Sequence, residues 1–170
     1  MRDVNVVVIF QSKVGLTGFA STEQLALAAA VGAVQGRANI RLRRLPDAAI
    51  SPAANEGTTE YVAPRESDAV WADAIIVGMP AGPGSLSIGF ERYFHSLDAL
   101  RRQGKLEGKI GASFTQGFEA EPLMAAMRHA GLTTLPEPPE TRDPAAPTAA
   151  RLQGRRVAEA VRARRAPSNV

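Results

Sequence analysis

A polar loop that follows an apolar segment is the first candidate for chemistry in this 170-residue chain. Residues 6–10 are all apolar, which is typical of a strand buried on both faces of a parallel sheet. The loop after them contains Ser12, Gly15, Thr17 and Gly18, and a helical pattern follows. Backbone N–H groups and the positive end of a helix dipole meet at such a junction and favour a phosphate group. The loop is therefore a candidate phosphate site. The alternative is that Ser12 and Thr17 only cap the helix.

Two further loops occur in the same setting. The loop at 80–85 follows the apolar segment 74–79, and the loop at 115–118 follows the segment 109–114. Both loops contain glycine and small polar residues. In an open parallel sheet, ligands bind outside the carboxyl ends of the strands, near the point where the strand order reverses. Three loops of this kind together are stronger evidence for a ligand site than any one of them alone.

Strand and helix patterns alternate along the chain and would position these loops. Strands are predicted at 5–10, 39–45, 74–79, 109–114 and 132–135. Helices are predicted at 17–34, 66–71, 87–103, 121–130 and 148–164. A long surface loop is expected at 46–66 and a proline-rich connection at 136–147. This alternation predicts an α/β fold, a three-layer sandwich around a five-stranded parallel sheet, with residues 1–170 as a single domain.

Periodicity predicts which side of each helix is apolar. In helix 17–34, Leu27, Val31 and Val34 lie at helical spacing and are the expected apolar face, with Gly36 as the stop. In the last helix, the residues expected to be buried are Ala150, Gly154, Val157 and Val161.

The second strand and the third helix have patterns of their own. In strand 39–45 arginine alternates with aliphatic residues, which is typical of an edge strand with one face in water. In helix 87–103, Ser87 is the expected N-cap and Gly104 the stop. A stripe along this helix, with Tyr93 beside it, is interpreted as core packing and not as a cofactor-binding motif. The stripe consists of Phe90, Phe94, Leu97 and Leu100.

Composition excludes several classes of protein. The chain has no cysteine, so disulfides and thiolate metal sites are impossible, and its two histidines, His95 and His129, lack partners at metal-ligand spacing. No segment has the length of a membrane span or the pattern of a signal peptide, so a cytoplasmic protein is expected. The net charge is +3, and no nucleic-acid-binding motif accompanies the arginines. The loops match neither the P-loop nor the Gly-x-Gly-x-x-Gly pattern.

Three segments resemble a known family. They are WADAIIVGMP (71–80), GKLEGKIGASF (104–114) and QGRRVAE (153–159). Through them the chain resembles the flavodoxin-like flavoproteins, and among these the NAD(P)H:quinone oxidoreductases of the Trp-repressor-binding-protein type. The resemblance implies the strand order 2-1-3-4-5, FMN as the cofactor and NAD(P)H as the co-substrate. It also implies a homodimer or homotetramer.

The resemblance also implies which residues hold FMN. Ser12 and Thr17 would bind its phosphate together with backbone N–H groups of residues 14–18, and Phe118 would supply an aromatic face, pack in the core or contact another subunit. No catalytic side chain is carried over. The implied cofactor-binding residues are Ser12, Val14, Gly15, Leu16, Thr17, Gly18, Pro80, Ala81, Gly82, Gly84, Ser85, Thr115, Gln116, Gly117 and Phe118.

Three functions follow from these patterns. The first is an FMN-dependent oxidoreductase that transfers electrons from NAD(P)H to a quinone or a similar small molecule, with no nucleic-acid partner. The second is a flavodoxin-like scaffold that has lost FMN, because Gly82 and Pro83 replace the bulky pair that lines the flavin ring in the family. The third is a flavodoxin-type electron carrier. A sequence pI of about 9.8 argues against the third, because such carriers are usually acidic.

Overall fold

Five parallel strands form one sheet in the computed structural model, which describes residues 2–11, 22–46, 61–79, 86–115, 120–136 and 146–166. The strands are β1 (Val4–Phe10), β2 (Ala38–Arg44), β3 (Ala74–Met79), β4 (Ile110–Thr115) and β5 (Thr133–Leu135). Their order is β2-β1-β3-β4-β5, which is the flavodoxin-like order expected from the resemblance. The predicted strands are confirmed to within one residue at each end, and β2 lies at the edge of the sheet as its arginine alternation indicates.

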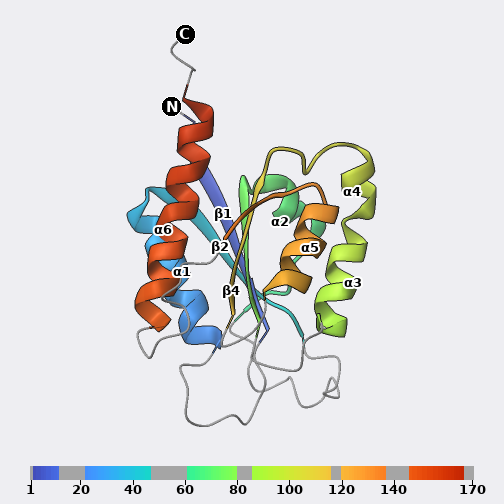
Figure 1. The fold of residues 1–170 in the computed structure, drawn as a ribbon, viewed down its shortest axis with the longest axis horizontal. Helices are drawn as coiled ribbons and strands as arrows, with labels where there is room; N and C mark the ends of the chain where they lie inside the picture. The colour runs from blue at the N-terminus through green and yellow to red at the C-terminus, as the bar shows by residue number, and fades with distance from the viewer. Residues whose placement is uncertain are drawn as a thin grey trace.

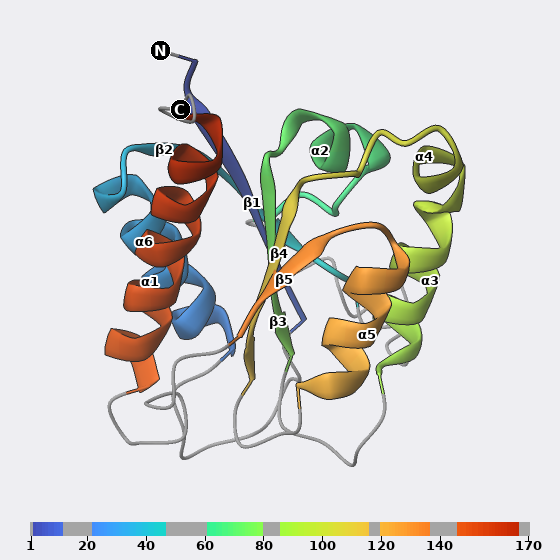
Figure 2. The same ribbon diagram turned by 45° about the horizontal axis from the view of Figure 1, so that its top comes forward.

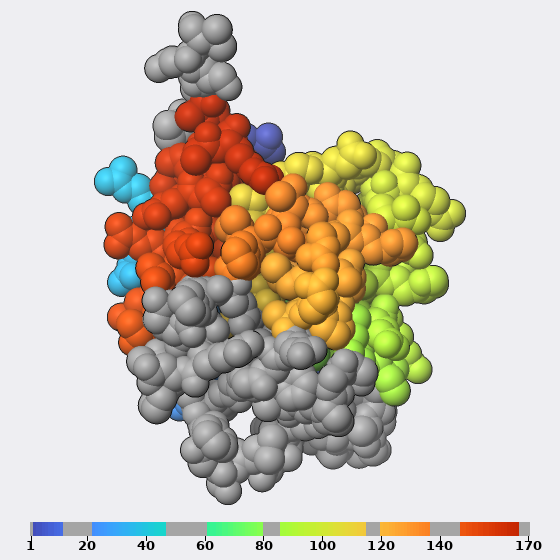
Figure 3. All heavy atoms as spheres, viewed as in Figure 1, coloured from blue at the N-terminus to red at the C-terminus, as the bar shows by residue number. Residues whose placement is uncertain are grey.

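Helices cover both faces of this sheet (Figures 1 and 2). On one face lie α1 (Thr22–Gln35) and α6 (Ala146–Arg165). On the other face lie α2 (Glu66–Trp71), α3 (Ile88–Ser96), α4 (Asp98–Arg102) and α5 (Glu121–His129). The predicted three-layer sandwich is therefore confirmed. In the space-filling view of Figure 3, α6 lies directly beside the β5–α5 segment on this face of the molecule.

Both faces of the strand β1 are buried, which explains why its sequence is apolar without alternation. Val6, Val8 and Phe10 are fully buried against α1 and α6, whereas Val7 and Ile9 are fully buried on the opposite face of the sheet. Burial of a side chain of this size contributes about 1.5–3 kcal/mol. Because both faces of β1 are covered, a single polar residue in it would face a hydrophobic layer.

The helices α1 and α6 pack unusually close to each other through glycine. A Cβ atom on Gly32 would lie 1.8 Å from the carbonyl oxygen of Arg151, and one on Gly154 would lie 1.9 Å from that of Ala29. Neither position has room for a larger residue. The predicted burial of the last helix is confirmed, because Ala150, Gly154, Val157 and Val161 all face the core.

The predicted apolar face of the first helix is wrong. Leu27, Val31 and Val34 are 42%, 45% and 53% exposed. The buried face consists instead of Leu25 and a set of small residues, which let α1 approach both the sheet and α6. These residues are Leu25, Ala26, Ala28, Ala29, Ala30, Gly32 and Ala33. The helix ends at Gln35, so the predicted stop at Gly36 is confirmed, whereas its start at Thr22 follows residues outside the described ranges.

The predicted helix 87–103 is divided in the structure. It consists of α3 and α4, which meet at Leu97, and Leu97 is fully buried. The N-cap prediction is confirmed, because the Ser87 hydroxyl oxygen accepts a hydrogen bond from the backbone N–H of Phe90 (3.2 Å). Gly104, with φ +68°, ends the helical segment as expected. The apolar stripe is buried, and the rings of Tyr93 and Phe94 pack edge to face with centroids 5.7 Å apart.

Candidate cofactor site

The strands that precede the three candidate loops are neighbours in the sheet. Phe10 at the end of β1 pairs with Gly78 of β3, and Met79 at the end of β3 pairs with Thr115 at the end of β4. Because β1, β3 and β4 are parallel, their carboxyl ends lie at one edge, at the lower end of the view in Figure 2. The strand order reverses between β1 and β3, since the chain moves from β1 outward to β2 and then back past β1 to β3. This edge is where open α/β sheets bind ligands.

Of the candidate cofactor-binding residues, Thr115 alone belongs to the described part of the chain, as the last residue of β4. The others lie outside the described residues, so their roles remain predictions. They are Ser12, Val14, Gly15, Leu16, Thr17, Gly18, Pro80, Ala81, Gly82, Gly84, Ser85, Gln116, Gly117 and Phe118. Most of the predicted surface loop 46–66 and of the predicted connection 136–147 also lies outside the described residues, namely 47–60 and 137–145.

Gln11 begins the first candidate loop, and the sequence analysis did not single it out. It is 7% exposed, and its backbone N–H donates a hydrogen bond to the carbonyl oxygen of Gly78 (3.1 Å). Its side-chain nitrogen lies 3.0 Å from where a Cβ atom on Gly89 would be, so the first turn of α3 approaches it closely. Gln11 therefore connects the start of the first loop to β3 and to the helix that follows the second loop. A buried polar residue at the end of an apolar strand is the signal that could have identified it.

A buried carboxylate fastens α2 to the edge strand β2. Asp68 is 2% exposed and accepts hydrogen bonds from the guanidinium groups of Arg41 (3.0 Å) and Arg43 (3.0 and 3.1 Å) and from the backbone N–H of Arg65 (3.0 Å). The Arg41 guanidinium also lies 4.1 Å from the ring centroid of Trp71. Burial alone would raise the pKa of the Asp68 carboxyl, but the bonds from Arg43, Arg65 and Arg41 outweigh it and hold the pKa below its usual value.

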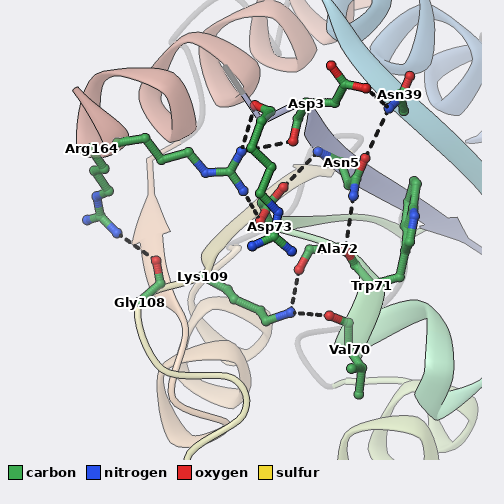
Figure 4. Close-up of polar contacts among 12 residues, drawn as sticks. Asp3, Asn5, Asn39, Val70, Trp71, Ala72, Asp73, Gly108, Lys109 and Arg164 are labelled. Atoms are coloured by element: carbon green, nitrogen blue, oxygen red, sulfur yellow. Dashed lines mark hydrogen bonds and ion pairs between the residues drawn. The ribbon is translucent and has the colours of Figure 1, made fainter. Parts of the chain in front are cut away.

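Lys109 lies at the amino end of the sheet, immediately before β4, and binds the C-terminus of α2 (Figure 4). Its ammonium group donates to the carbonyl oxygens of Ala69 (2.8 Å), Val70 (2.8 Å) and Ala72, at the C-terminus of α2. Burial lowers the pKa of Lys109, and the nearby charge of Asp73 opposes that effect. These bonds satisfy carbonyl groups that a helix leaves without partners at its end.

The basic end of α6 reaches the same edge. Arg165 pairs with Asp73 and donates to the carbonyl oxygens of Arg2 (3.2 Å) and Asp3 (2.9 Å), and Arg164 donates to that of Gly108 (3.3 Å). Figure 4 shows Arg164 directed toward Gly108. These arginines have structural partners, which gives them a role within the fold. The amino edge of the sheet is thus held together by polar contacts, whereas the strands that precede the candidate loops end at the opposite, carboxyl edge.

The two histidines have exposed or terminal positions. The imidazole of His95 is 86% exposed and lies 3.3 Å from the Asp98 carboxylate, and His129 is in the last turn of α5. Within the described ranges, no cluster of three potential metal ligands occurs. No helix among the described residues combines the length and the apolar character needed to cross a membrane.

Comparison with curated proteins identifies relatives in sequence. The chain is 33% identical over 120 residues to the NAD(P)H dehydrogenase (quinone) of Archaeoglobus fulgidus, a match that covers 65% of this chain and 60% of the relative. It is 28% identical over 105 residues to NAD(P)H dehydrogenase (quinone) 3 of Rhizobium meliloti, which covers 58% of this chain and 49% of the relative. The matches thus span about half to three fifths of the length of these relatives. No family profile matches the chain.

Comparison with solved structures confirms the fold. A flavodoxin, WrbA-like protein from Agrobacterium tumefaciens superposes with a TM-score of 0.64 at 22% identity, over 95% of this chain and 99% of that one. A flavodoxin from the Archaea superposes with a TM-score of 0.63 at 16% identity, over 94% and 99% of the two chains. Rubredoxin oxygen:oxidoreductase from Desulfovibrio gigas superposes with a TM-score of 0.67 at 19% identity, over 95% of this chain and 37% of that chain.

Proposed function

We propose that this chain, which has the flavodoxin-like fold, is an FMN-dependent oxidoreductase that transfers electrons from NAD(P)H to a quinone or a similar small molecule. The observation that carries the proposal is that β1, β3 and β4, the strands that precede the three candidate loops, end side by side at one edge of the sheet. The names of the sequence relatives support the choice of NAD(P)H and quinone as substrates.

The described strands and helices that flank these loops support the assignment of a flavin nucleotide. The first loop lies between the buried end of β1 and the N-terminus of α1, where backbone N–H groups favour a phosphate. The second loop lies between β3 and the N-terminus of α3, and the third starts after Thr115. When bound, FMN would supply the redox chemistry, namely two-electron transfer between NAD(P)H and the acceptor. The protein would hold and orient the reactants.

In this proposal, the first loop holds the phosphate. Ser12 and Thr17 donate hydrogen bonds from their hydroxyl groups, and the backbone N–H groups of residues 14–18 complete the cradle. The loops at 80–85 and 115–118 border the flavin ring. A cytoplasmic location and a homodimeric or homotetrameric assembly are part of the same proposal, and size-exclusion chromatography with light scattering tests the assembly.

The double substitution Ser12→Ala with Thr17→Val tests the phosphate assignment. We expect it to weaken FMN binding by about 1–3 kcal/mol, or roughly 5- to 150-fold in Kd, because hydrogen bonds to a charged group are lost. Quenching of flavin fluorescence during titration measures this Kd.

The matched control is Thr133→Val, which removes an exposed hydroxyl group from β5. It should leave FMN affinity unchanged. NADPH should bleach the flavin bound to the wild-type protein, and menadione should restore its colour. A wild-type protein that takes up no FMN would favour the scaffold function instead, and an unchanged Kd in the double variant would reject the roles of Ser12 and Thr17.

A further inference from the structure

The outward face of α1 is apolar and carries no charge over most of its length. Leu27, Val31 and Val34 lie along it at spacings typical of one helix face, and all three are exposed. Between Glu23 in the first turn and Arg37, just beyond the end of the helix, the chain has no charged residue. Single exposed aliphatic side chains are common, whereas an aligned set of them indicates a surface that a partner covers. We call Leu27, Val31 and Val34 the α1 stripe.

The other long helices that the structure describes have charged outward faces. The helix α3 exposes Glu91 and Arg92, α5 exposes Glu121 and Arg128, and α6 exposes several arginines. A helix that is largely uncharged on all sides is normally buried on all sides. The inward side of α1 packs on the sheet and on α6 (Figure 2). Its outward side is therefore expected to pack against another protein surface.

The α1 stripe is complementary to a second copy of itself. If two α1 helices pack antiparallel about a two-fold axis at the middle of the stripe, Leu27 faces Val34 of the second copy and Val31 faces Val31. The same axis brings Glu23 of each copy near Arg37 of the other, because both residues lie at similar distances along the chain from its middle. An ion pair then flanks the apolar contact at each end. Parallel pairing would instead place like charges side by side.

Other partners fit the α1 stripe less well. A helix that binds an anionic membrane carries basic residues along its polar face, and α1 has none between its first and last residues. A strongly acidic or strongly basic protein would meet opposite charges at the two ends of the stripe, Glu23 and Arg37, and so would find only one of them complementary. A second copy of the chain satisfies both ends at once.

We infer that the α1 stripe is the two-fold contact of a homodimer, formed by antiparallel packing of α1 on α1 of a second copy. This inference rests on the proposed function, within which it specifies the surface for assembly, but it requires no bound FMN. A contact centred on one helix pair is at the small end of protein interfaces, so we expect a dissociation constant in the micromolar range.

The substitution Val31→Glu tests the contact at its centre. Two carboxylates would meet at the two-fold axis in an apolar contact, so we expect the dimer Kd to rise at least about a hundredfold. Sedimentation velocity from micromolar to submillimolar chain concentrations measures this Kd. The thermal unfolding temperature, measured below the wild-type Kd, should stay the same, because Val31 is exposed in the single chain. The FMN affinity should also stay the same.

Leu152→Glu is the matched control for Val31→Glu. Leu152 is 44% exposed and Val31 is 45% exposed, and each change places a carboxylate on the outside of a helix. Leu152 belongs to α6 and lies outside the α1 stripe. The control should therefore leave the dimer Kd unchanged.

A charge exchange tests the antiparallel direction. Glu23→Lys and Arg37→Glu each replace the two expected ion pairs by two like-charge pairs, so each variant alone should dimerise about five- to twentyfold more weakly than wild type. In an equimolar mixture, Lys at position 23 of one variant meets Glu at position 37 of the other, and the native Glu23 and Arg37 form the second pair. The mixture should form heterodimers with a Kd close to that of wild type.

The outcomes distinguish this inference from the proposed function. If wild type associates and Val31→Glu associates equally well, α1 is not the contact, although the proposed assembly stands. An equal loss of association in Leu152→Glu, or a mixture as weak as either charge variant alone, also overturns the inference. If wild type is a monomer at every concentration, the inference and the proposed assembly both fail, and the stripe is left to a different protein. The FMN titration tests the redox function independently in each case.

Discussion

The substitution Asp68→Asn is expected to lower the free energy of unfolding at pH 7 by about 2–3 kcal/mol. The carboxylate of Asp68 accepts four hydrogen bonds, three of them from the guanidinium groups of Arg41 and Arg43. An amide oxygen cannot compensate two positive charges or accept from every donor, so the arginines lose their partner. The side chains of Arg41 and Arg43 are 36% and 20% exposed, and partial hydration of them keeps the loss below that of a fully buried pair.

The dependence of this loss on pH has a definite sign. Because the pKa of Asp68 is lower in the folded protein than in the unfolded chain, the contribution of this residue is present in full above the unfolded pKa, about pH 4. It disappears as the pH falls through the folded pKa. Urea unfolding of wild type and Asp68→Asn between pH 7 and pH 2 should show a constant difference down to about pH 4 and a shrinking one below it.

A surface carboxylate provides the comparison. Glu159 pairs with Arg155 at 2.8 Å, but both side chains are more than half exposed. Glu159→Gln should cost less than about 0.5 kcal/mol. An equal loss for Asp68→Asn and Glu159→Gln would contradict the view that Asp68 fastens α2 to β2.

The substitution Gly154→Ala is the second change with a large expected effect. In an open helix, alanine would stabilise by about 1 kcal/mol relative to glycine. Here the new Cβ atom would lie 1.9 Å from the carbonyl oxygen of Ala29, so α1 and α6 would have to move apart. We expect a net loss of about 2 kcal/mol or more in the free energy of unfolding, with a sign opposite to that of helix propensity.

The exposed face of the same helix offers a control for Gly154→Ala. Ala163→Val adds two methyl groups where α6 faces solvent, so it should cost only the difference in helix propensity, about 0.5 kcal/mol. Chemical denaturation measures both variants. A gain in stability for Gly154→Ala would show that the two helices are not held together at the distance described above.

The error in the first helix shows where hydrophobic periodicity misleads. Leu27, Val31 and Val34 have the spacing of an apolar face, yet they are exposed. The opposite face is rich in alanine and glycine, whose small side chains allow close packing. A hydrophobicity scale gives larger aliphatic side chains the higher values, whereas close contact between α1 and α6 requires the smaller ones. Pattern analysis would have needed the position of α6 to choose between the two faces.

The sheet was predictable because its signal is local. The strands β1 and β3 are mostly apolar without alternation, because both of their faces are buried. Continuous apolar segments of this kind indicate a parallel sheet. The break at Leu97 was not predictable in this way. The apolar stripe continues through it from Phe90 to Leu100, and both parts of the divided helix bury that stripe.

The strand ends that flank the candidate site could be predicted, but the contacts within the site could not. Parallel strands must end at one edge, and the register of β1, β3 and β4 confirms that geometry. The buried hydroxyl group of Tyr93, by contrast, gives no signal in the sequence. A tyrosine beside an apolar stripe reads as core packing, and only the absence of a partner for its hydroxyl group among the described residues marks it as unusual.

The most direct test of the central claim compares FMN with riboflavin by isothermal titration calorimetry on the purified chain. If main-chain N–H groups and hydroxyl groups of residues 12–18 hold the phosphate, FMN should bind at one site per chain and roughly a hundredfold or more tighter than riboflavin. Equal affinities for the two flavins, or no heat of binding with FMN, would contradict the account.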